Sequence, residues 1–465
     1  MSRDIPSKDT IAILERGIPL FRGGATYRDE AEAAHQKGHV RPAQLILDRA
    51  QGDFVWDLDG QRYIDLQNGW ATNPIGNAHP EVIEAVHQAH LRYGFHYEHP
   101  LRYELAEKLA DLMPGRELPR FSFEVSGTEA AEAATFIALC HKRRRYVIAF
   151  GSAFHGESIA GKLMSGYDAS RNLYLEAWTG GVIKAPYPYS EDLPAGMNQD
   201  QYVDYCLWYL DNHIPKCIAP KESIAAVLIE PGLAEGGNWI PTRDFMRGIR
   251  ELCDRNDWLM IADEVLTGLG RTGRMWGVEH YDVIPDLLVV GKNLSGGIEP
   301  FAGVAARDGI LGDNPQSGTG STFAATPAGC AAALKTLEIL ARDRVVEHAA
   351  MLGEIALPIL KSFEKYPIVS QARALGLLMG VSFRDPDGGK DSWISRGVRS
   401  AMLRNGAYPI CDNEEVTVRM YPALNMEESV LREALEIMED AIVHVSEHGH
   451  AEGDYPTYPT GDYGA

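Results

Sequence analysis

A lysine that directly follows an apolar segment is the residue of this chain best suited to covalent chemistry. Lys292 comes after Leu287–Gly291 and before the glycine-containing segment 293–297. At the end of a buried strand an amine is desolvated and loses its proton more readily, as a Schiff-base nucleophile requires. A lysine whose ammonium group reaches solvent from a strand end would show the same local pattern.

Two carboxylates occupy comparable positions elsewhere in the chain. Glu230 follows Ile224–Ile229, and Asp263 follows Trp258–Ala262. A carboxylate at the end of a buried strand is poorly placed for hydration and needs a polar partner. On these residues alone, Asp263 is equally compatible with a helix N-cap and with a functional carboxylate.

Two further segments could bind a flat, phosphorylated molecule. Ser126–Ala130 follows Phe121–Val125 and leads into a helical pattern, so its glycine and the free N–H groups of a helix start favour phosphate binding. Phe154–Gly156 follows Tyr146–Phe150, and its aromatic ring could stack on a planar cofactor. Taken singly, the first segment also fits an ordinary capped helix, and Phe154 also fits a core position.

The apolar segments before these groups are the elements that must position them. They are short, they are bounded by polar residues or glycine, and they alternate with helical patterns between about residues 80 and 330. Such segments are typical of strands buried on both faces, so we expect an α/β fold with a large, doubly wound, mainly parallel sheet. Ligands of such sheets bind beyond the C-terminal ends of the strands. A phosphate site, a ring, a carboxylate and a Schiff-base lysine would meet there, and pyridoxal phosphate needs these parts.

The two ends of the chain show different patterns. Residues 53–65 predict a hairpin with an Asp59-Gly60 turn, and an alanine-rich helix follows Thr326. We therefore expect both chain ends to build a second, smaller α+β domain. The expected division is 1–79 and 331–447 for the small domain, 80–330 for the large cofactor-binding domain, and 448–465 for a poorly ordered tail.

Composition excludes several classes of function. The length of 465 residues suggests two or three domains, and the formal charge of −21 argues against a nucleic-acid partner. The sequence has no secretory signal and no apolar run of roughly 18 to 20 residues, so we expect no membrane partner. The six cysteines lie far apart without metal-ligand spacing, which favours no metal and a reducing compartment, the cytoplasm.

The ordered set of motifs closely resembles the class III aminotransferases, a fold-type-I family of pyridoxal-phosphate enzymes that includes ornithine, 4-aminobutyrate and ω-amino acid aminotransferases. The resemblance extends from about Asp53 to Leu424. The motifs that carry it are Asp59-Gly60, Tyr63–Asp65, His79-Pro80, Ser126–Ala130, Phe154–Gly156, Ile229–Pro231, Asp263–Val265, Gly270–Gly273, Pro285-Asp286, Lys292, Ser321–Phe323 and Arg419.

The resemblance implies a role for each matching residue at the cofactor. Lys292 would form the Schiff base and move the proton, Asp263 would pair with the pyridine nitrogen, and Phe154 and Val265 would enclose the ring. Glu230 would support the region around Asp263. The residues that the resemblance assigns to cofactor binding are Gly127, Thr128, Phe154, His155, Glu230, Asp263, Val265, Lys292 and Thr322, and the catalytic ones are Lys292 and Asp263.

The resemblance also implies how substrates and subunits meet. Arg419 would receive an α-carboxylate, and Glu235 would pair with that arginine when the substrate presents an amine or an apolar end. Trp70 would line the pocket, although it is equally compatible with a core position in the small domain. Thr322 would reach the phosphate of the neighbouring subunit, which implies a homodimer with shared active sites.

Several positions depart from the family pattern. Phe154 stands where a tyrosine is usual, and Leu266 stands where many members have a glutamine that contacts the ring oxygen. Gly232-Leu233-Ala234 replaces a more usual Val-Gln-Gly, and Ala324–Pro327 replaces a more usual ending of the Gly-Asn-Pro type. These departures leave Lys292 and Asp263 in place, so they bear on the substrate and the reaction type.

We therefore expect an aminotransferase that moves an amino group from an ω-amino acid, amine or amino acid to a 2-oxo acid, with 2-oxoglutarate favoured. A lyase, decarboxylase or amino-acid racemase of the same family is the main alternative, because one fold and one lysine serve all these reactions. A nucleotide-dependent dehydrogenase lacks the G-x-G-x-x-G motif after an early strand. A non-catalytic relative would not need both Lys292 and Asp263.

Overall fold

The computed structural model describes residues 45–94, 98–166, 180–191, 193–312, 318–386, 392–411 and 416–449, with a few isolated positions besides. The chain divides into two compact units. The large unit comprises Thr72–Pro74 and His79–Ala350, and the small unit comprises Met1–Ala71, Ile75–Ala78 and Met351–Ala465. Residues 450–465, most of the tail predicted to be poorly ordered, lie outside the described residues.

Among the described residues, seven strands form the sheet of the large unit, in the order β4-β10-β9-β8-β7-β5-β6. Strands β9, β8, β7, β5 and β6 are parallel to one another, whereas β10 is antiparallel to both β9 and β4. Two successive reversals make β4 point the same way as β9. The strands are β4 (Arg120–Glu124), β5 (Tyr146–Phe150), β6 (Val182–Ala185), β7 (Ile224–Ile229), β8 (Leu259–Asp263), β9 (Leu287–Val290) and β10 (Ala302–Ala306).

The predicted doubly wound, mainly parallel sheet is therefore confirmed, but the sequence patterns missed two of its strands. β10 consists of alanine, glycine and valine, and alanine and glycine are depleted in strands. β6 is a four-residue edge strand interrupted by Lys184. Neither segment therefore has the large apolar residues that mark the other five strands.

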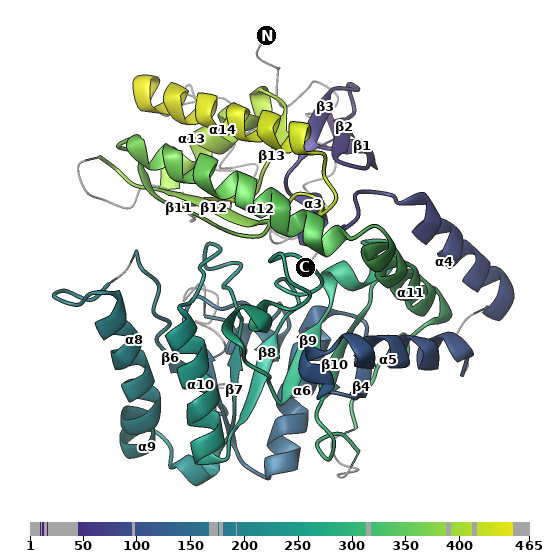
Figure 1. Cartoon of the computed structure of the whole chain (residues 1–465), viewed down its shortest axis with the longest axis vertical. Coiled ribbons are helices and arrows are strands. Elements are labelled where there is room, and N and C mark those ends of the chain that lie inside the picture. The colour runs from purple at the N-terminus through teal and green to yellow at the C-terminus, as the bar shows by residue number, and fades with distance from the viewer. Residues whose placement is uncertain are drawn as a thin grey trace. The chain divides into compact units, whose positions relative to one another are not determined.

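Helices cover both faces of this sheet, as Figure 1 shows. Successive side chains of a strand point to opposite faces, so Val227 and Ile229 of β7 pack with residues of α8 and α10, while Leu228 packs with α6. The helices of the large unit are α4 (Pro80–Tyr93), α5 (Pro100–Leu112), α6 (Gly127–Lys142), α7 (Ile159–Met164), α8 (Gln199–Trp208), α9 (Ile214–Cys217), α10 (Arg243–Asn256) and α11 (Pro327–Arg342). α12 (Val345–Ser362) begins in this unit and continues into the small one.

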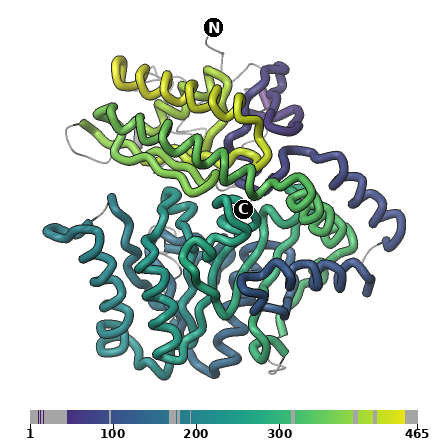
Figure 2. The backbone as a smooth tube through the Cα atoms, viewed as in Figure 1, coloured from purple at the N-terminus to yellow at the C-terminus, as the bar shows by residue number. Residues whose placement is uncertain are grey.

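Helix α11 corrects the predicted domain boundary. It packs against α4 and α5, and all three belong to the large unit (Figure 2). The large unit ends at Ala350, whereas the sequence patterns predict its end at residue 330, inside this helix. The alanine-rich sequence of α11 indicates that the helix is buried, but it does not indicate against which unit.

The small unit takes its residues from both ends of the chain. The predicted hairpin is formed by β2 (Phe54–Asp57) and β3 (Arg62–Asp65), and β3 pairs in parallel with β13 (Ala407–Tyr408) from the C-terminal part. The remaining elements of this unit are β1 (Leu47–Gln51), α3 (Asn68–Ala71), β11 (Val369–Leu375), β12 (Leu378–Phe383), α13 (Ser392–Arg404), β14 (Thr417–Met420) and α14 (Glu428–His448).

The turn labelled α3 has the opposite hand to the other helices. Asn68, Gly69, Trp70 and Ala71 have φ values of 54, 59, 59 and 63°, a left-handed conformation that costs L-residues roughly 1–2 kcal/mol each. The buried Asp65 carboxylate fixes its start, because it accepts hydrogen bonds from the backbone N–H groups of Gln67 (3.1 Å) and Asn68 (2.7 Å). No helix in the described part of the chain is long and apolar enough to cross a membrane.

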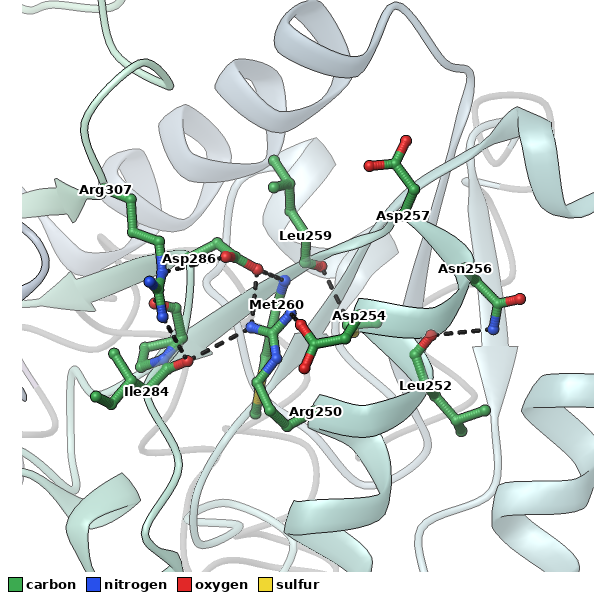
Figure 3. A network of polar contacts seen from close by, with 12 residues as sticks. Arg250, Leu252, Asp254, Asn256, Asp257, Leu259, Met260, Ile284, Asp286 and Arg307 are labelled. Atoms are coloured by element: carbon green, nitrogen blue, oxygen red, sulfur yellow. Dashed lines mark hydrogen bonds and ion pairs between the residues drawn. The ribbon is translucent and has the colours of Figure 1, made fainter.

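A polar network fixes the register of the two central strands at their N-terminal ends (Figure 3). Asp286, directly before β9, accepts a hydrogen bond from the backbone N–H of Met260 in β8 (2.7 Å), and its own N–H donates to the Met260 carbonyl (2.9 Å). The same carboxylate is paired with Arg250 of α10 (2.8 Å) and with Arg307 after β10 (3.3 Å). The network thus ties together the strands that lead to Asp263 and Lys292.

Candidate active site

The structure brings the predicted cofactor residues of the large unit to one edge of its sheet. β4, β5, β7, β8 and β9 point in the same direction, so the segments that follow them emerge at the same edge. The residues placed there are Gly127 and Thr128 after β4, Phe154 and His155 after β5, Glu230 after β7, Asp263 and Val265 at and after β8, and Lys292 after β9.

Asp263 is buried and held at both carboxylate oxygens. His155 Nδ1 lies 2.8 Å from Asp263 Oδ2, and the Val265 backbone N–H donates to Oδ1 over 3.1 Å. An ionised carboxylate only accepts hydrogen bonds, so His155 carries its proton on Nδ1. His155 Nε2 is buried and has no hydrogen-bond partner among the described residues. The carboxylate is therefore oriented by the protein and can accept one more donor, such as a protonated ring nitrogen.

The Val265 side chain connects the helix start to the lysine segment. A Cβ atom on Gly127 would lie 2.9 Å from Val265 Cγ1, and a Cβ atom on Gly291 would lie 3.5 Å from the same atom. Gly127 is therefore required for this approach, because real Cβ contacts are longer than 3.0 Å. The close packing brings the first residue of α6 beside the residue that precedes Lys292.

The start of α6 has the features of an anion site. Ser126 Oγ accepts from the N–H of Glu129 (3.2 Å), which leaves the first N–H groups of this 16-residue helix, with its positive dipole end, at the sheet edge. Gly156 faces it with φ +123°, and a Cβ atom there would lie 2.5 Å from the Thr128 side chain. A larger residue at position 156 would therefore fill the space beside Thr128.

Glu230 links two loops of the site. Its carboxylate accepts from the backbone N–H of Phe154 (2.7 Å) and of Ala234 (3.1 Å). Burial, followed by the neighbouring Asp263 charge, raises the pKa of Glu230 to about 8, and the positive charge of Lys292 opposes this shift. Phe154 and the loop that carries Glu235 are therefore held by one buried group.

Glu235 lies in a tight loop closed by reciprocal hydrogen bonds. The Leu233 N–H donates to the Trp239 carbonyl (2.9 Å), and the Trp239 N–H donates to the Leu233 carbonyl (3.0 Å). Glu235 itself is half-buried between these two residues. The backbone position of Glu235 is thus defined by the protein, and its role toward substrate stays a prediction.

Lys292 begins a short turn in a strained backbone conformation. It is half-buried and has φ 41°, in the region that favours glycine. The turn η8 (Lys292–Ser295) is fixed by its second residue, since Asn293 Nδ2 donates to the Gly268 carbonyl (3.3 Å). Backbone strain of this kind persists only where the surrounding structure enforces it, and it is common at active sites.

The other predicted site residues do not follow strands of this sheet. Thr322 is exposed in the turn before α11, Arg419 is fully buried in β14, and Trp70 is half-buried in the left-handed turn. Arg419 Nη1 donates to Tyr421 Oη (3.3 Å). Arg419 and Trp70 belong to the small unit, so their roles toward substrate stay predictions, as does the contact of Thr322 with a neighbouring subunit.

Sequence reasoning missed one buried acid beside the site. Glu264 accepts from the backbone N–H groups of Gly277 (2.9 Å) and Val278 (2.8 Å), and burial raises its pKa to about 7. Glu264, which lies between Asp263 and Val265 in the sequence, therefore links the segment after β8 to Gly277 and Val278. The only signal was its position: a second carboxylate directly after a buried strand also needs a buried partner.

The motif order and this geometry agree with a match to known proteins. The family model for aminotransferase class-III matches residues 35–442. This chain belongs to the class-III aminotransferases. It is 31% identical to a probable 4-aminobutyrate aminotransferase of Bacillus subtilis (strain 168), over 89% of this chain and 97% of that protein.

Two further relatives extend the comparison. An alanine/serine racemase of Pyrococcus horikoshii is 29% identical over 87% of this class-III aminotransferase and 86% of the racemase. The crystal structure of an (S)-enantioselective omega-transaminase from Thermomicrobium roseum is 29% identical, with a TM-score of 0.80, and the match covers 89% of this chain and 98% of that one. The fold-type-I architecture expected from the sequence is thus confirmed.

Class-III aminotransferases use pyridoxal phosphate, and the residues of this chain fit that cofactor. The free N–H groups at the α6 start suit a phosphate. Gly127 and Gly156 allow Val265 and Thr128 to pack closely beside that start, because a Cβ atom would lie 2.9 Å and 2.5 Å from those side chains. The buried Asp263 carboxylate has capacity for a ring N–H, and Lys292 supplies the amine. The predicted cofactor is therefore confirmed at the level of the family.

Proposed function

We propose that this aminotransferase moves an amino group from an ω-amino acid, amine or amino acid to a 2-oxo acid, with 2-oxoglutarate as the favoured acceptor. The observation that carries the proposal is the Asp263 carboxylate, fixed by His155 and the Val265 N–H, at the same sheet edge as Lys292. The similarity to a probable 4-aminobutyrate aminotransferase supports an ω-amino acid as donor.

Each residue has a defined task in this proposal. Bound pyridoxal phosphate supplies an aldehyde that condenses with amines and a protonated ring that withdraws electrons from the reacting carbon. Lys292 would hold the aldehyde carbon and, once the substrate amine has displaced it, carry the proton. Asp263 would keep the ring nitrogen protonated, and the N–H groups of Gly127 and Thr128 would bind the phosphate.

The substrate residues follow from the resemblance. Arg419 would receive the α-carboxylate of the amino acid and 2-oxo acid couple, because its planar guanidinium binds carboxylates through two parallel hydrogen bonds. Glu235 would neutralise that arginine for substrates that present an amine or an apolar end, and Trp70 would line the pocket. Thr322, which is exposed, would reach the phosphate of the neighbouring subunit in a homodimer with shared sites. The six free cysteines support a cytoplasmic location.

An amino-acid racemase is the second candidate, and the alanine/serine racemase relative favours it. Both reactions begin by removing a proton from the same substrate carbon, so Lys292 and Asp263 serve either outcome. The two differ in stoichiometry: transamination consumes a 2-oxo acid, whereas racemisation needs no acceptor. Measuring D- and L-alanine with and without 2-oxoglutarate therefore separates them.

The absorption spectrum of the purified protein tests the proposal. We expect a yellow band from cofactor bound through Lys292, which bleaches with L-glutamate alone and returns with 2-oxoglutarate. The Lys292→Ala variant should lose this band while still binding the cofactor. An absorption band that does not change with L-glutamate would favour another amino donor or racemisation. The absence of any band would overturn the proposal.

A further inference from the structure

The turn that carries Thr322 contains a residue in an unfavourable conformation. In the turn, the Ala324 N–H donates to the Ser321 carbonyl (3.0 Å), and Thr326 caps α11 by accepting from the Gly329 N–H (3.1 Å). Between them Ala325 has φ +52°, in the left-handed region that favours glycine. Alanine rarely adopts this conformation, so we expect a contact from outside the turn to stabilise Ala325 in it.

That contact comes from a buried histidine far away in the sequence. His99 Nε2 lies 2.9 Å from the carbonyl oxygen of Ala325, and His99 is only 4% exposed. A carbonyl only accepts, so the histidine proton sits on Nε2. The other ring nitrogen, Nδ1, is buried and has no hydrogen-bond partner among the described residues. Within the described structure, the one donor of this imidazole is therefore used on Ala325.

The rest of the turn points away from this anchor. Thr322 and Phe323 are exposed, Phe323 by 56%, whereas Ala325 is 7% exposed and packs inward. His99 directly precedes α5, which packs against α11. The buried bond at one end of the turn therefore determines how the exposed end is presented.

We propose that His99 is a positioning residue for the cofactor phosphate: it holds the Ser321–Ala325 turn in the conformation that presents Thr322. The inference rests on the proposed role of Thr322 toward the phosphate of the neighbouring subunit. His99 does not touch the cofactor in this account. It acts through the Ala325 carbonyl, and its effect appears in cofactor retention.

The affinity of the full-length dimer for pyridoxal 5′-phosphate tests this inference. His99→Phe keeps a ring of similar bulk but removes the donor, and we expect the dissociation constant to rise about fivefold to tenfold, the size of one lost hydrogen bond. His99→Gln retains an N–H donor and should recover most of the affinity. Adding Ala325→Gly to His99→Phe should recover part of it, because glycine adopts the left-handed conformation without strain.

A double-mutant cycle with Thr322→Val separates this inference from the function on which it rests. If His99 acts through Thr322, adding His99→Phe to Thr322→Val should weaken cofactor binding by far less than His99→Phe does alone. Additive effects, or an unchanged affinity in His99→Phe, would overturn the role of His99. An unchanged affinity in Thr322→Val would instead overturn the proposed role of Thr322. Melting of the cofactor-free variants reports any general loss of stability.

Discussion

The His155 imidazole donates a hydrogen bond of 2.8 Å to the Asp263 carboxylate, and both side chains are buried. The other Asp263 oxygen accepts from the Val265 N–H, so the carboxylate is oriented before any ligand arrives. Groups whose geometry is fixed in advance stabilise developing charge without reorganising during the reaction. We therefore expect the His155–Asp263 pair to be important for the rate of the reaction.

Replacing His155 with phenylalanine should loosen Asp263 without removing it. Since misplacing a catalytic group by about 1 Å can cost about 10²-fold in rate, we expect kcat/KM to fall by about that factor. His280→Phe is the matched control, because it removes the donor of a comparable bond, to the Thr272 carbonyl (3.0 Å), away from Asp263. Equal effects of the two substitutions on kcat/KM would contradict the orienting role of His155.

Glu230 should make the stability of the protein depend on pH. Burial raises its pKa from 4.5 to about 8. Between these values the folded protein holds a proton that the unfolded chain has released, so the free energy of unfolding falls as pH rises through this window. Glu230→Gln, which stays neutral, should show a shallower fall in melting temperature from pH 5 to pH 8.5.

Some pH dependence should remain in the Glu230→Gln variant. Burial also raises the pKa of Glu264, to about 7, which contributes a fall of the same sign over a narrower range. The melting temperatures of the unchanged protein and of Glu230→Gln should therefore be most similar at pH 5. At that pH the folded protein holds Glu230 in its neutral form, as neutral as the glutamine that replaces it. Parallel curves over the whole range would show that Glu230 does not titrate in this window.

Gly156→Ala should disturb the phosphate site directly. The new methyl group would lie 2.5 Å from the Thr128 side chain, and φ +123° is a conformation that alanine rarely adopts. We expect both a less stable protein and a loss of affinity for pyridoxal phosphate. Gly60→Ala is the control: its φ is +75° but no atom lies within 4 Å, so only about 1–2 kcal/mol of stability should be lost. Cofactor titration of both variants distinguishes the two effects.

The Asp286 network should contribute to stability in proportion to its burial. Asp286 and Arg250 are 14% and 15% exposed, and removing one partner of a buried pair typically costs about 3–5 kcal/mol. Asp286→Ala should therefore lower the free energy of unfolding by about this amount. Asp308→Ala breaks an exposed pair with Arg120, 71% and 59% exposed, and should cost less than about 1 kcal/mol. Urea unfolding of the two variants measures the difference.

Local patterns were sufficient to predict most of the large unit. Five strands are predicted because they are short segments rich in apolar residues between polar residues or glycine, as in β7 and β9. The parallel arrangement then placed Asp263 and Lys292 at one edge without further information, because strand ends of parallel neighbours coincide. The sequence patterns miss β10 for the opposite reason, because its alanine and glycine residues do not indicate a strand.

The long-range partners could not be read from the sequence. His155 was expected near the cofactor, but nothing local showed that its ring nitrogen would meet a carboxylate 108 positions later. The bond between His99 and Ala325 spans 226 positions and is still less visible. Such pairings depend on the order of strands and the packing of helices, which sequence periodicity does not specify.

Different residues occupy the two ends of strands β8 and β9, and this affects which substitutions the enzyme can tolerate. At one end Asp286 fixes the register through Met260, and at the other end lie Asp263 and Lys292. Because the register does not depend on the ligand-facing loops, those loops can accumulate substitutions without unfolding the sheet. Libraries for new amine substrates would best vary the segment around Glu235 and leave Asp286 and its arginines unchanged.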